Sequence, residues 1–238
     1  MTEHTVKSYD KELEALGLRI VEMGGIAEKM LTDSMEALSS NNSDLATGTV
    51  ARDPRMDALQ RSIEENAVST IARRQPMASD LRELMGAVRI ANDLERVGDL
   101  SKNIAKRTLK VAAEPRIPRA TVGLRHMVEL AAHQLKDVLD AYTMRDVARA
   151  RAVWMRDAEI DALEDSIFRE LLTFMMEDPR NISYCTHLLF CSKKIERVGD
   201  HATNIAETVI YILTGETLPV DRPRGAENDA PALSKAPA

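Results

Sequence analysis

The sequence predicts an all-α protein made of two tandem, internally duplicated three-helix bundles, with six long helices in all. Three observations support this fold class: a composition typical of helices, few breaks in the helical pattern, and an internal repeat of about 100 residues. Aromatic residues form only 3% of the 238 residues, whereas Ala, Leu, Met, Glu and Arg, which lose little rotamer freedom in a helix, are abundant.

Breaks in the helical pattern divide the chain into six runs. Asn41-Asn42-Ser43 ends the first run, Asp53-Pro54 marks a cap or a local kink, and Gln75-Pro76 ends the second run. The segment 114–118 carries two prolines and cannot lie inside a helix, so we place the main boundary there. The six runs are expected at about 8–39, 43–75, 79–111, 119–142, 145–176 and 181–214.

These breaks predict two folded units followed by a tail. Residues 1–113 form the first bundle, residues 114–217 form the second, and residues 218–238 form a Pro-rich tail. The tail holds four of the nine prolines and almost no bulky apolar residue. We expect it to be disordered, because it cannot bury enough apolar surface to offset the entropy lost on ordering.

The two bundles are related by a repeat that is visible in the sequence itself. In the first two runs, Arg52-Asp53 falls on Arg156-Asp157, an offset of 104. In the third run the offset is 101, and Glu95-Arg96-Val97-Gly98-Asp99 falls on Glu196-Arg197-Val198-Gly199-Asp200. A repeat of this length fits a duplicated bundle and is too long for a solenoid of short units.

Charge, hydropathy and cysteine usage narrow the class of function. The net charge of −6 argues against nucleic acid as the main partner, because binding to phosphates needs a basic face. No apolar run approaches the roughly 20 residues that span a bilayer, and the N-terminus lacks the features of a signal peptide. Cys185 and Cys191 are interpreted as buried thiols in a reducing compartment. We therefore expect a cytoplasmic protein.

Each half carries two pairs of acidic residues with i, i+4 spacing, which places both members on one helix face, a turn apart. Like charges at this spacing repel, and a divalent cation between them reverses the sign of the interaction, since hard cations take several oxygen ligands. The pairs are Asp53/Asp57 and Glu95/Asp99 in the first half, and Asp157/Asp161 and Glu196/Asp200 in the second.

The same acids have simpler interpretations. Each pair could belong to a solvated helix face, and Asp53 before Pro54 could cap a helix N-terminus. However, Gly98 and Gly199 lie mid-helix beside the acids, where Gly costs up to about 1 kcal/mol relative to Ala. Close approach of a neighbouring helix or of a ligand explains both glycines, whereas a solvated face does not. The five-residue identity between two diverged halves also favours a metal or anion-related role.

The pairs Glu95/Asp99 and Glu196/Asp200 belong to longer blocks of sequence. In the first half these blocks are Gln75–Arg82, Leu94–Asp99 and Asn103–Ala105; in the second, one block runs from Ile195 to Glu207 and the unit ends at Gly215. Together the blocks resemble the PhoU family, over roughly residues 6–216. One Glu-x-x-x-Asp alone would carry no weight, but two such blocks in two aligned halves are highly specific.

The resemblance implies paired three-helix bundles, usually associated as a homodimer, and metal ions of the Fe, Mn or Mg type. The family's Glu/Asp-x-x-x-Asp metal motifs fall on the eight acids named above. Asn103 and Asn204, one turn further on, are expected to support the ligands. The second half departs from the pattern at Asp178-Pro179-Arg180-Asn181, so a partner contact made by Asp80-Leu81-Arg82 would exist in the first half only.

The resemblance also implies a function. It indicates a negative regulator of the phosphate-starvation response and modulator of phosphate uptake. Such a protein links the ATPase subunit of the phosphate-specific ABC transporter to the sensor histidine kinase PhoR. It would reach the inner membrane only through these partners.

Two other functions compete with this regulator. A carboxylate-bridged metal oxidase needs Glu-x-x-His pairs that face a helical core, and the sequence has none; Glu129 and His133 are i, i+4 instead. A helical scaffold without metal would use the acids only for solubility. No Ser or Cys has a His beside it in a motif typical of a nucleophile, so we expect no enzymatic activity.

Overall fold

The computed structural model describes residues 2–218; within this range the side chains of residues 2–10 and of Asp157 are not described. Residues 219–238, nearly all of the predicted tail, lie outside the described residues. Leu218, which the sequence pattern assigns to the tail, is partly buried against the hydrophobic core.

The described chain contains only helices and their connections, which confirms the all-α fold class. The elements are α1 (Thr2–Ser40), α2 (Ser43–Val50), α3 (Asp53–Arg74), α4 (Ser79–Val111), the 3-10 helix η1 (Pro118–Thr121), α5 (Val122–Met144), α6 (Val147–Met155), α7 (Asp157–Glu177), the 3-10 helix η2 (Pro179–Asn181) and α8 (Ile182–Thr214).

The six predicted runs are present, and the second and fifth are each divided into a short helix and a long one. Pro54 lies in the first turn of α3, where its ring and missing N–H prevent α2 from continuing into α3. The second half breaks at the equivalent place, Arg156, without a proline. Asn42 and Asp146, again 104 apart, cap α2 and α6 through their side-chain oxygens. The repeat therefore extends to the short helices and their caps.

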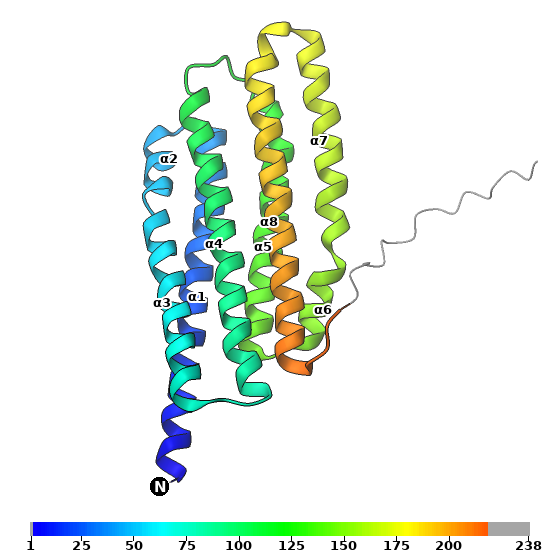
Figure 1. The fold of residues 1–238 in the computed structure, drawn as a ribbon. Coiled ribbons are helices and arrows are strands. Elements are labelled where there is room, and N and C mark those ends of the chain that lie inside the picture. Colours follow the sequence, from blue (N-terminus) through cyan, green and yellow to red (C-terminus); the bar gives the residue numbers. More distant parts are fainter. Residues whose placement is uncertain (1, 219–238) are drawn as a thin grey trace, which may run out of the picture.

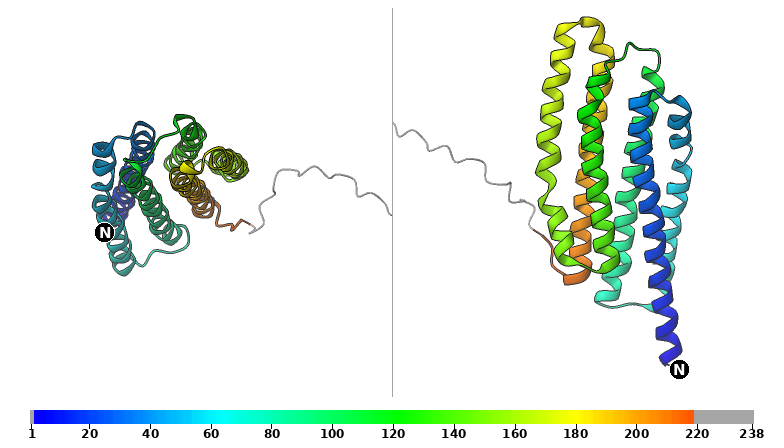
Figure 2. Two further views of the ribbon diagram at one scale, coloured as in Figure 1. Left: turned by 90° about the horizontal axis from the view of Figure 1, so that it is seen from above. Right: turned by 180° about the vertical axis from the view of Figure 1, so that it is seen from behind.

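The helices form two units of the same design that lie side by side (Figures 1 and 2). In each unit a long first helix packs against a long last helix: α1 against α4, and α5 against α8. The acid-bearing helices α3 and α7 lie at the two outer edges, each against the last helix of its own unit. The units meet where α4 contacts α8 and α1 contacts α5.

The two units share one hydrophobic core, because close contacts cross the seam between them. An ideal Cβ on Gly24 of α1 would lie 2.4 Å from Leu139 Cδ1 of α5, and one on Gly86 of α4 would lie 2.4 Å from Ile212 Cδ1 of α8. His201 of α8 also approaches α4, with its Nδ1 2.9 Å from Asp93 Oδ1. Small residues thus allow the helices of the two units to approach closely.

Replacing Gly24 with Leu should separate α1 from α5. The control is Gly25→Leu at the adjacent, exposed position, where an ideal Cβ meets no atom within 4 Å. Both changes improve helix propensity equally, so the difference between their free energies of unfolding measures the packing of α1 against α5. We expect Gly24→Leu to be less stable than Gly25→Leu by about 1–3 kcal/mol in denaturant unfolding. Equal free energies of unfolding would contradict the close packing of α1 on α5.

Candidate functional site

An ion pair that occurs in both halves sets the start of each acid-bearing helix. Arg52 Nη1 bonds Asp33 Oδ2 at 2.6 Å, and Arg156 Nη1 bonds Asp137 Oδ2 at 2.9 Å. Both partners keep the offset of 104. The same contact therefore joins α1 to the residue before α3 in the first half, and α5 to the residue before α7 in the second. This contact places Asp53 and Asp157 at the first position of their helices.

The glycines beside the acids are explained by helix packing. An ideal Cβ on Gly98 would lie 3.3 Å from Met56 of α3, and one on Gly199 would lie 2.9 Å from Ile160 Cδ1 of α7. Met56 and Ile160 are again 104 apart. The predicted close approach of a neighbouring helix is therefore confirmed in both halves, and it brings α3 and α7 over the acid-bearing turns of α4 and α8.

This approach leaves Glu95, Asp53 and Glu196 half-buried, which argues against a fully solvated face for these three acids, whereas Asp161 is exposed. The side chains of Glu95 and Asp53 are each 18% exposed, and that of Glu196 is 16% exposed. Asp53 does not cap α3 either: it is a helical residue, and its carboxylate accepts a hydrogen bond from Lys102. We call the contact of α3 with α4 at the first-half acids the first-half groove, and the contact of α7 with α8 at the second-half acids the second-half groove.

In the first-half groove the acids of both helices converge on one ammonium group. Lys102 Nζ lies 2.8 Å from Asp53 Oδ1 of α3 and 2.5 Å from Asp99 Oδ1 of its own helix α4. Burial raises the pKa of Glu95, and the nearby Asp99 and Asp57 carboxylates raise it further. Arg96 and Lys102 act on this pKa in the opposite direction, but burial and the two carboxylates outweigh them.

The second-half groove is built differently. Glu196 Oε1 accepts a hydrogen bond at 2.9 Å from Lys193, whose side chain is 59% exposed at the rim. The other oxygen, Glu196 Oε2, is buried, and no described residue bonds it. The negative charge of Asp161 contributes to the raised pKa of Lys193, and Asp200 has contacts of its own. The Asp157 side chain is outside the described set.

A buried amide lies beside the same turn of α8. Gln134 of α5 is almost fully buried, its Nε2 donates to Arg156 O at 3.3 Å, and its Oε1 has no partner among the described side chains. That oxygen would lie 3.7 Å from a Cβ on Gly199. Position 134 aligns with Met30 in the first half, so this amide is a feature of the second half only. The second-half site therefore offers two buried oxygen acceptors that remain unused.

These grooves differ in how well they fit a metal ion. Among the described side chains, no three carboxylate, imidazole or thiol groups are arranged to hold one. In the first half all four acids are described, and an ammonium lies where a cation would bridge the two helices. In the second half, the unpartnered Glu196 Oε2 and the oxygen-rich donor set suit a hard cation.

Other residues singled out by the sequence lie outside these grooves or on their margins. Asn103 is half-buried and Asn204 is exposed, and no described side chain joins either amide to the acids. His201 contacts Asp93 across the seam, so it belongs to the interface between the units. Cys185 and Cys191 are buried free thiols, as expected, and burial raises the pKa of Cys191 to about 12.

Sequence reasoning missed Lys102, Lys193 and Gln134. One signal was available for Lys102: it follows Asp99 by three residues, and at an offset of 101 its counterpart is Thr203. Within the most similar block of the repeat, a lysine of the first half aligns with a threonine of the second half. The two halves therefore differ in charge at this position.

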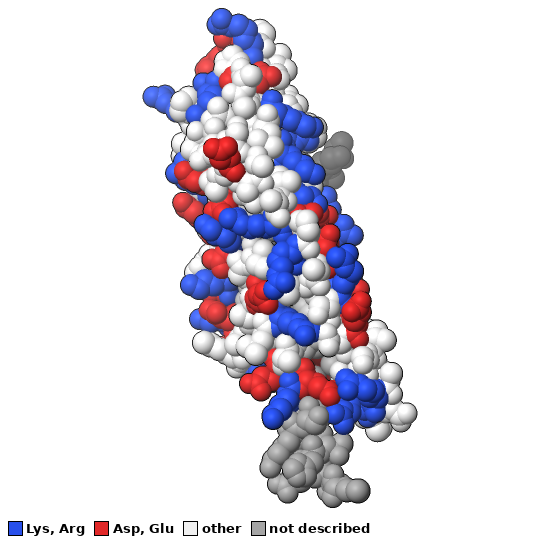
Figure 3. Space-filling view, turned by 90° about the vertical axis from the view of Figure 1, so that its left-hand side faces the viewer, with Lys and Arg blue, Asp and Glu red and all other residues white. Residues whose placement is uncertain are grey.

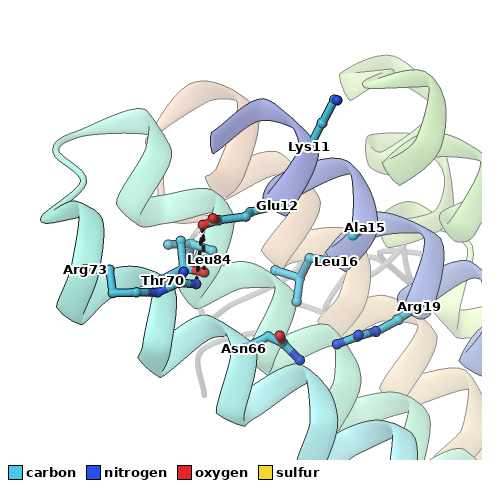
Figure 4. Close-up of a pocket in the computed structure, with 9 residues that line it drawn as sticks. All are labelled: Lys11, Glu12, Ala15, Leu16, Arg19, Asn66, Thr70, Arg73 and Leu84. Atoms are coloured by element: carbon cyan, nitrogen blue, oxygen red, sulfur yellow. Dashed lines mark hydrogen bonds and ion pairs between the residues drawn. The ribbon is translucent and has the colours of Figure 1, made fainter. Parts of the chain in front are cut away.

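A separate cleft of about 280 Å³ lies at the other end of α3, between α1, α3 and α4 (Figure 4). Glu12 spans it and bonds Arg74 Nη2 at 2.9 Å, which lowers the pKa of this carboxyl. Arg19 and Asn66 extend towards each other on its far side. Nine residues, about 13 Å of helix, separate Asn66 from Asp57, so the cleft is not part of the acid groove.

The face that carries α3 shows no basic stripe (Figure 3). Lysine and arginine side chains alternate there with aspartate and glutamate side chains. Both signs of charge are therefore interspersed on this face.

The sequence matches the PhoU domain over residues 20–108 and 124–209, and these two segments coincide with the two helical units. The chain belongs to the PhoU family. It is 56% identical over 222 residues to the phosphate-specific transport system accessory protein PhoU homolog of Rhizobium meliloti, covering 93% of each chain. The homolog with the same description in Caulobacter vibrioides is 51% identical, over 94% of this chain and 97% of its own.

Two solved structures of PhoU proteins have the same fold. The crystal structure of PhoU from Pseudomonas aeruginosa matches with a TM-score of 0.84 and 37% identity, over 87% of this chain and 100% of that chain. The phosphate transport system regulatory protein PhoU from Streptococcus pneumoniae matches with a TM-score of 0.81 and 26% identity, over 89% and 100%. The PhoU architecture of paired helical units is thus shared along nearly the whole described chain.

No helix in residues 2–218 of this PhoU-family chain combines the length and apolar character needed to cross a bilayer.

The Asp33–Arg52 pair should make the stability of this PhoU-family chain depend on pH. Burial alone would raise the pKa of Asp33, but hydrogen bonds from Lys29 and Arg52 outweigh it and hold the pKa below its usual range. The stabilisation is therefore complete above the unfolded-state pKa, about 3.9, and is lost as pH falls through the lower folded-state value. Asp33→Asn should cost about 1–3 kcal/mol at pH 7, measured by denaturant unfolding.

The loss of unfolding free energy caused by Asp33→Asn should shrink as pH falls towards 3. In this range wild type itself loses the stabilisation that the Asp33 carboxylate provides. Asp140→Asn is the matched control, since its pair with Arg149 is exposed and such pairs contribute less than about 1 kcal/mol. An equal Asp33→Asn penalty at pH 7 and pH 3 would exclude a role for the charge.

Proposed function

We propose that this protein is a negative regulator of the phosphate-starvation response and a modulator of phosphate uptake. The observation that carries the proposal is the match, over more than nine-tenths of the chain, to phosphate-specific transport system accessory proteins of the PhoU family. The relative at 56% identity covers 93% of each chain, and this span includes both units. The same accessory role therefore fits this chain.

The regulator acts as a docking protein in the cytoplasm. It links the ATPase subunit of a phosphate ABC transporter to a sensor histidine kinase of the PhoR type, and it meets the inner membrane only through them. The described helices supply long faces for such partners: Phe168, Leu172 and Met176 of α7 are exposed apolar side chains spaced by four residues. The same face is suited to self-association into a homodimer.

The second-half groove holds a divalent or iron-type cation, such as Mg²⁺, Mn²⁺ or Fe²⁺. Glu196 and Asp200 of α8, with Asp157 and Asp161 of α7, supply the oxygen ligands. The buried, unpartnered Glu196 Oε2 supports this assignment, because a buried carboxylate oxygen without a partner is costly and a bound cation removes that cost. The cation would join α7 to α8; the ammonium of Lys193 can swing away, since it lies at the rim.

Deleting the gene should raise phosphate-starvation gene expression and phosphate uptake in phosphate-rich medium, because the repressing contact is lost. The effect should disappear when the transporter or the kinase is also deleted, since the regulator then has nothing to act through. Reporter expression and uptake of labelled phosphate measure both outcomes. A deletion strain with normal phosphate-responsive expression and uptake would refute the regulatory role.

Glu196→Gln combined with Asp200→Asn should abolish metal binding in the second half. Metal analysis and Mn²⁺ binding by electron paramagnetic resonance, on protein purified without chelator, measure the loss. The matched control, Asp165→Asn with Glu170→Gln, removes two exposed acids of α7 and should leave binding unchanged. Wild type that binds no metal under any of these conditions would favour a metal-free scaffold, and iron-dependent oxygen uptake would favour an oxidase.

A further inference from the structure

The two halves place a positive charge differently in otherwise equivalent grooves. In the first half Lys102 lies inside the groove, with its side chain 17% exposed. At the offset of 101 the second half has Thr203, whose hydroxyl donates to Gly199 O of its own helix at 3.1 Å. The lysine of the second half, Lys193, is on the rim, and its counterpart in the first half is Asn92.

We propose that the Lys102 ammonium is the built-in cation of the first-half groove, so that Asp53, Asp57, Glu95 and Asp99 are held without a metal and only the second half responds to metal. This inference rests on the proposed metal site of the second half, and it assigns to Lys102 the bridging role that a metal plays there.

The geometry around Lys102 supports the view that its ammonium takes the place of a bridging metal. Its Nζ contacts one carboxylate from each helix, Asp53 of α3 at 2.8 Å and Asp99 of α4 at 2.5 Å. Two of the three ammonium protons are thus used to join the helices that a bridging metal would join. A second cation ligated by the same two carboxylates would lie within a few ångströms of Nζ, and two like charges at that distance repel strongly in a half-buried groove.

A second cationic side chain lies on the outer side of the groove. Arg96, whose side chain is exposed, lies 3.7 Å from Glu95 Oε2 and neutralises part of the outer charge. Asp53 and Asp99 thus contact the Lys102 ammonium, and Glu95 lies beside Arg96. By contrast, the buried Glu196 Oε2 of the second half has no bonded partner among the described residues.

The test uses the full chain with the second-half site disabled by Glu196→Gln and Asp200→Asn. In this background we expect no Mn²⁺ binding above the level of an exposed-lysine control, Lys106→Thr. Adding Lys102→Thr, which copies the second half, should create about one Mn²⁺ site per chain and should make the thermal midpoint rise on addition of Mn²⁺. Lys102→Arg keeps the cation and should bind no Mn²⁺.

Each outcome decides the inference. Mn²⁺ bound in the background that retains Lys102, and removed by Glu95→Gln, overturns it. Failure of Lys102→Thr to gain Mn²⁺ also overturns it; if that variant does not fold in either EDTA or Mn²⁺, Lys102→Met, which keeps the length of the side chain, replaces it. A wild-type chain without metal, together with a gain in Lys102→Thr, rejects the proposed second-half site but supports the role of Lys102.

Discussion

The packing of α4 against α8 is the constraint on which the rest of the molecule depends. Each of these helices is the last of its unit and contacts its own unit as well as the other unit. Ile90, Leu94 and Val97 of α4 are fully buried as a result. Polar side chains of α4 and α8 lie on the remaining faces of these helices, and α3 or α7 packs beside some of them. The acids are therefore forced into grooves with restricted access to water.

Half-buried carboxylates need compensation, because the loss of water disfavours their charged form. The chain provides it at several places with arginine or lysine, as in the Asp33–Arg52 and Asp137–Arg156 pairs that fix the starts of α3 and α7. These two pairs kept the same geometry in both halves. The acid grooves did not, although the surrounding backbone and the glycines are alike. The two halves thus share their packing and these two ion pairs, and differ in the cations beside the acids.

The sequence predicted the features that depend on local pattern. Helical runs, the repeat and the close approach at Gly98 and Gly199 follow from periodicity, offsets and the cost of glycine in a helix. It did not predict that Glu95 is half-buried, because a helical wheel gives the direction of a side chain but not the helix that covers it. Lys102 was missed for the same reason: only the position of Asp53 on α3 reveals that Asp99 and a second helix share its ammonium.

The contact between His201 and Asp93 links the grooves to the seam between the units. His201 follows Glu196 by five residues on α8, so one helix carries both the groove that faces α7 and the contact that holds α4. A rigid helix cannot shift at one of these points without moving the other. A shift of α8 towards α7 would therefore strain the His201–Asp93 contact that joins α8 to α4.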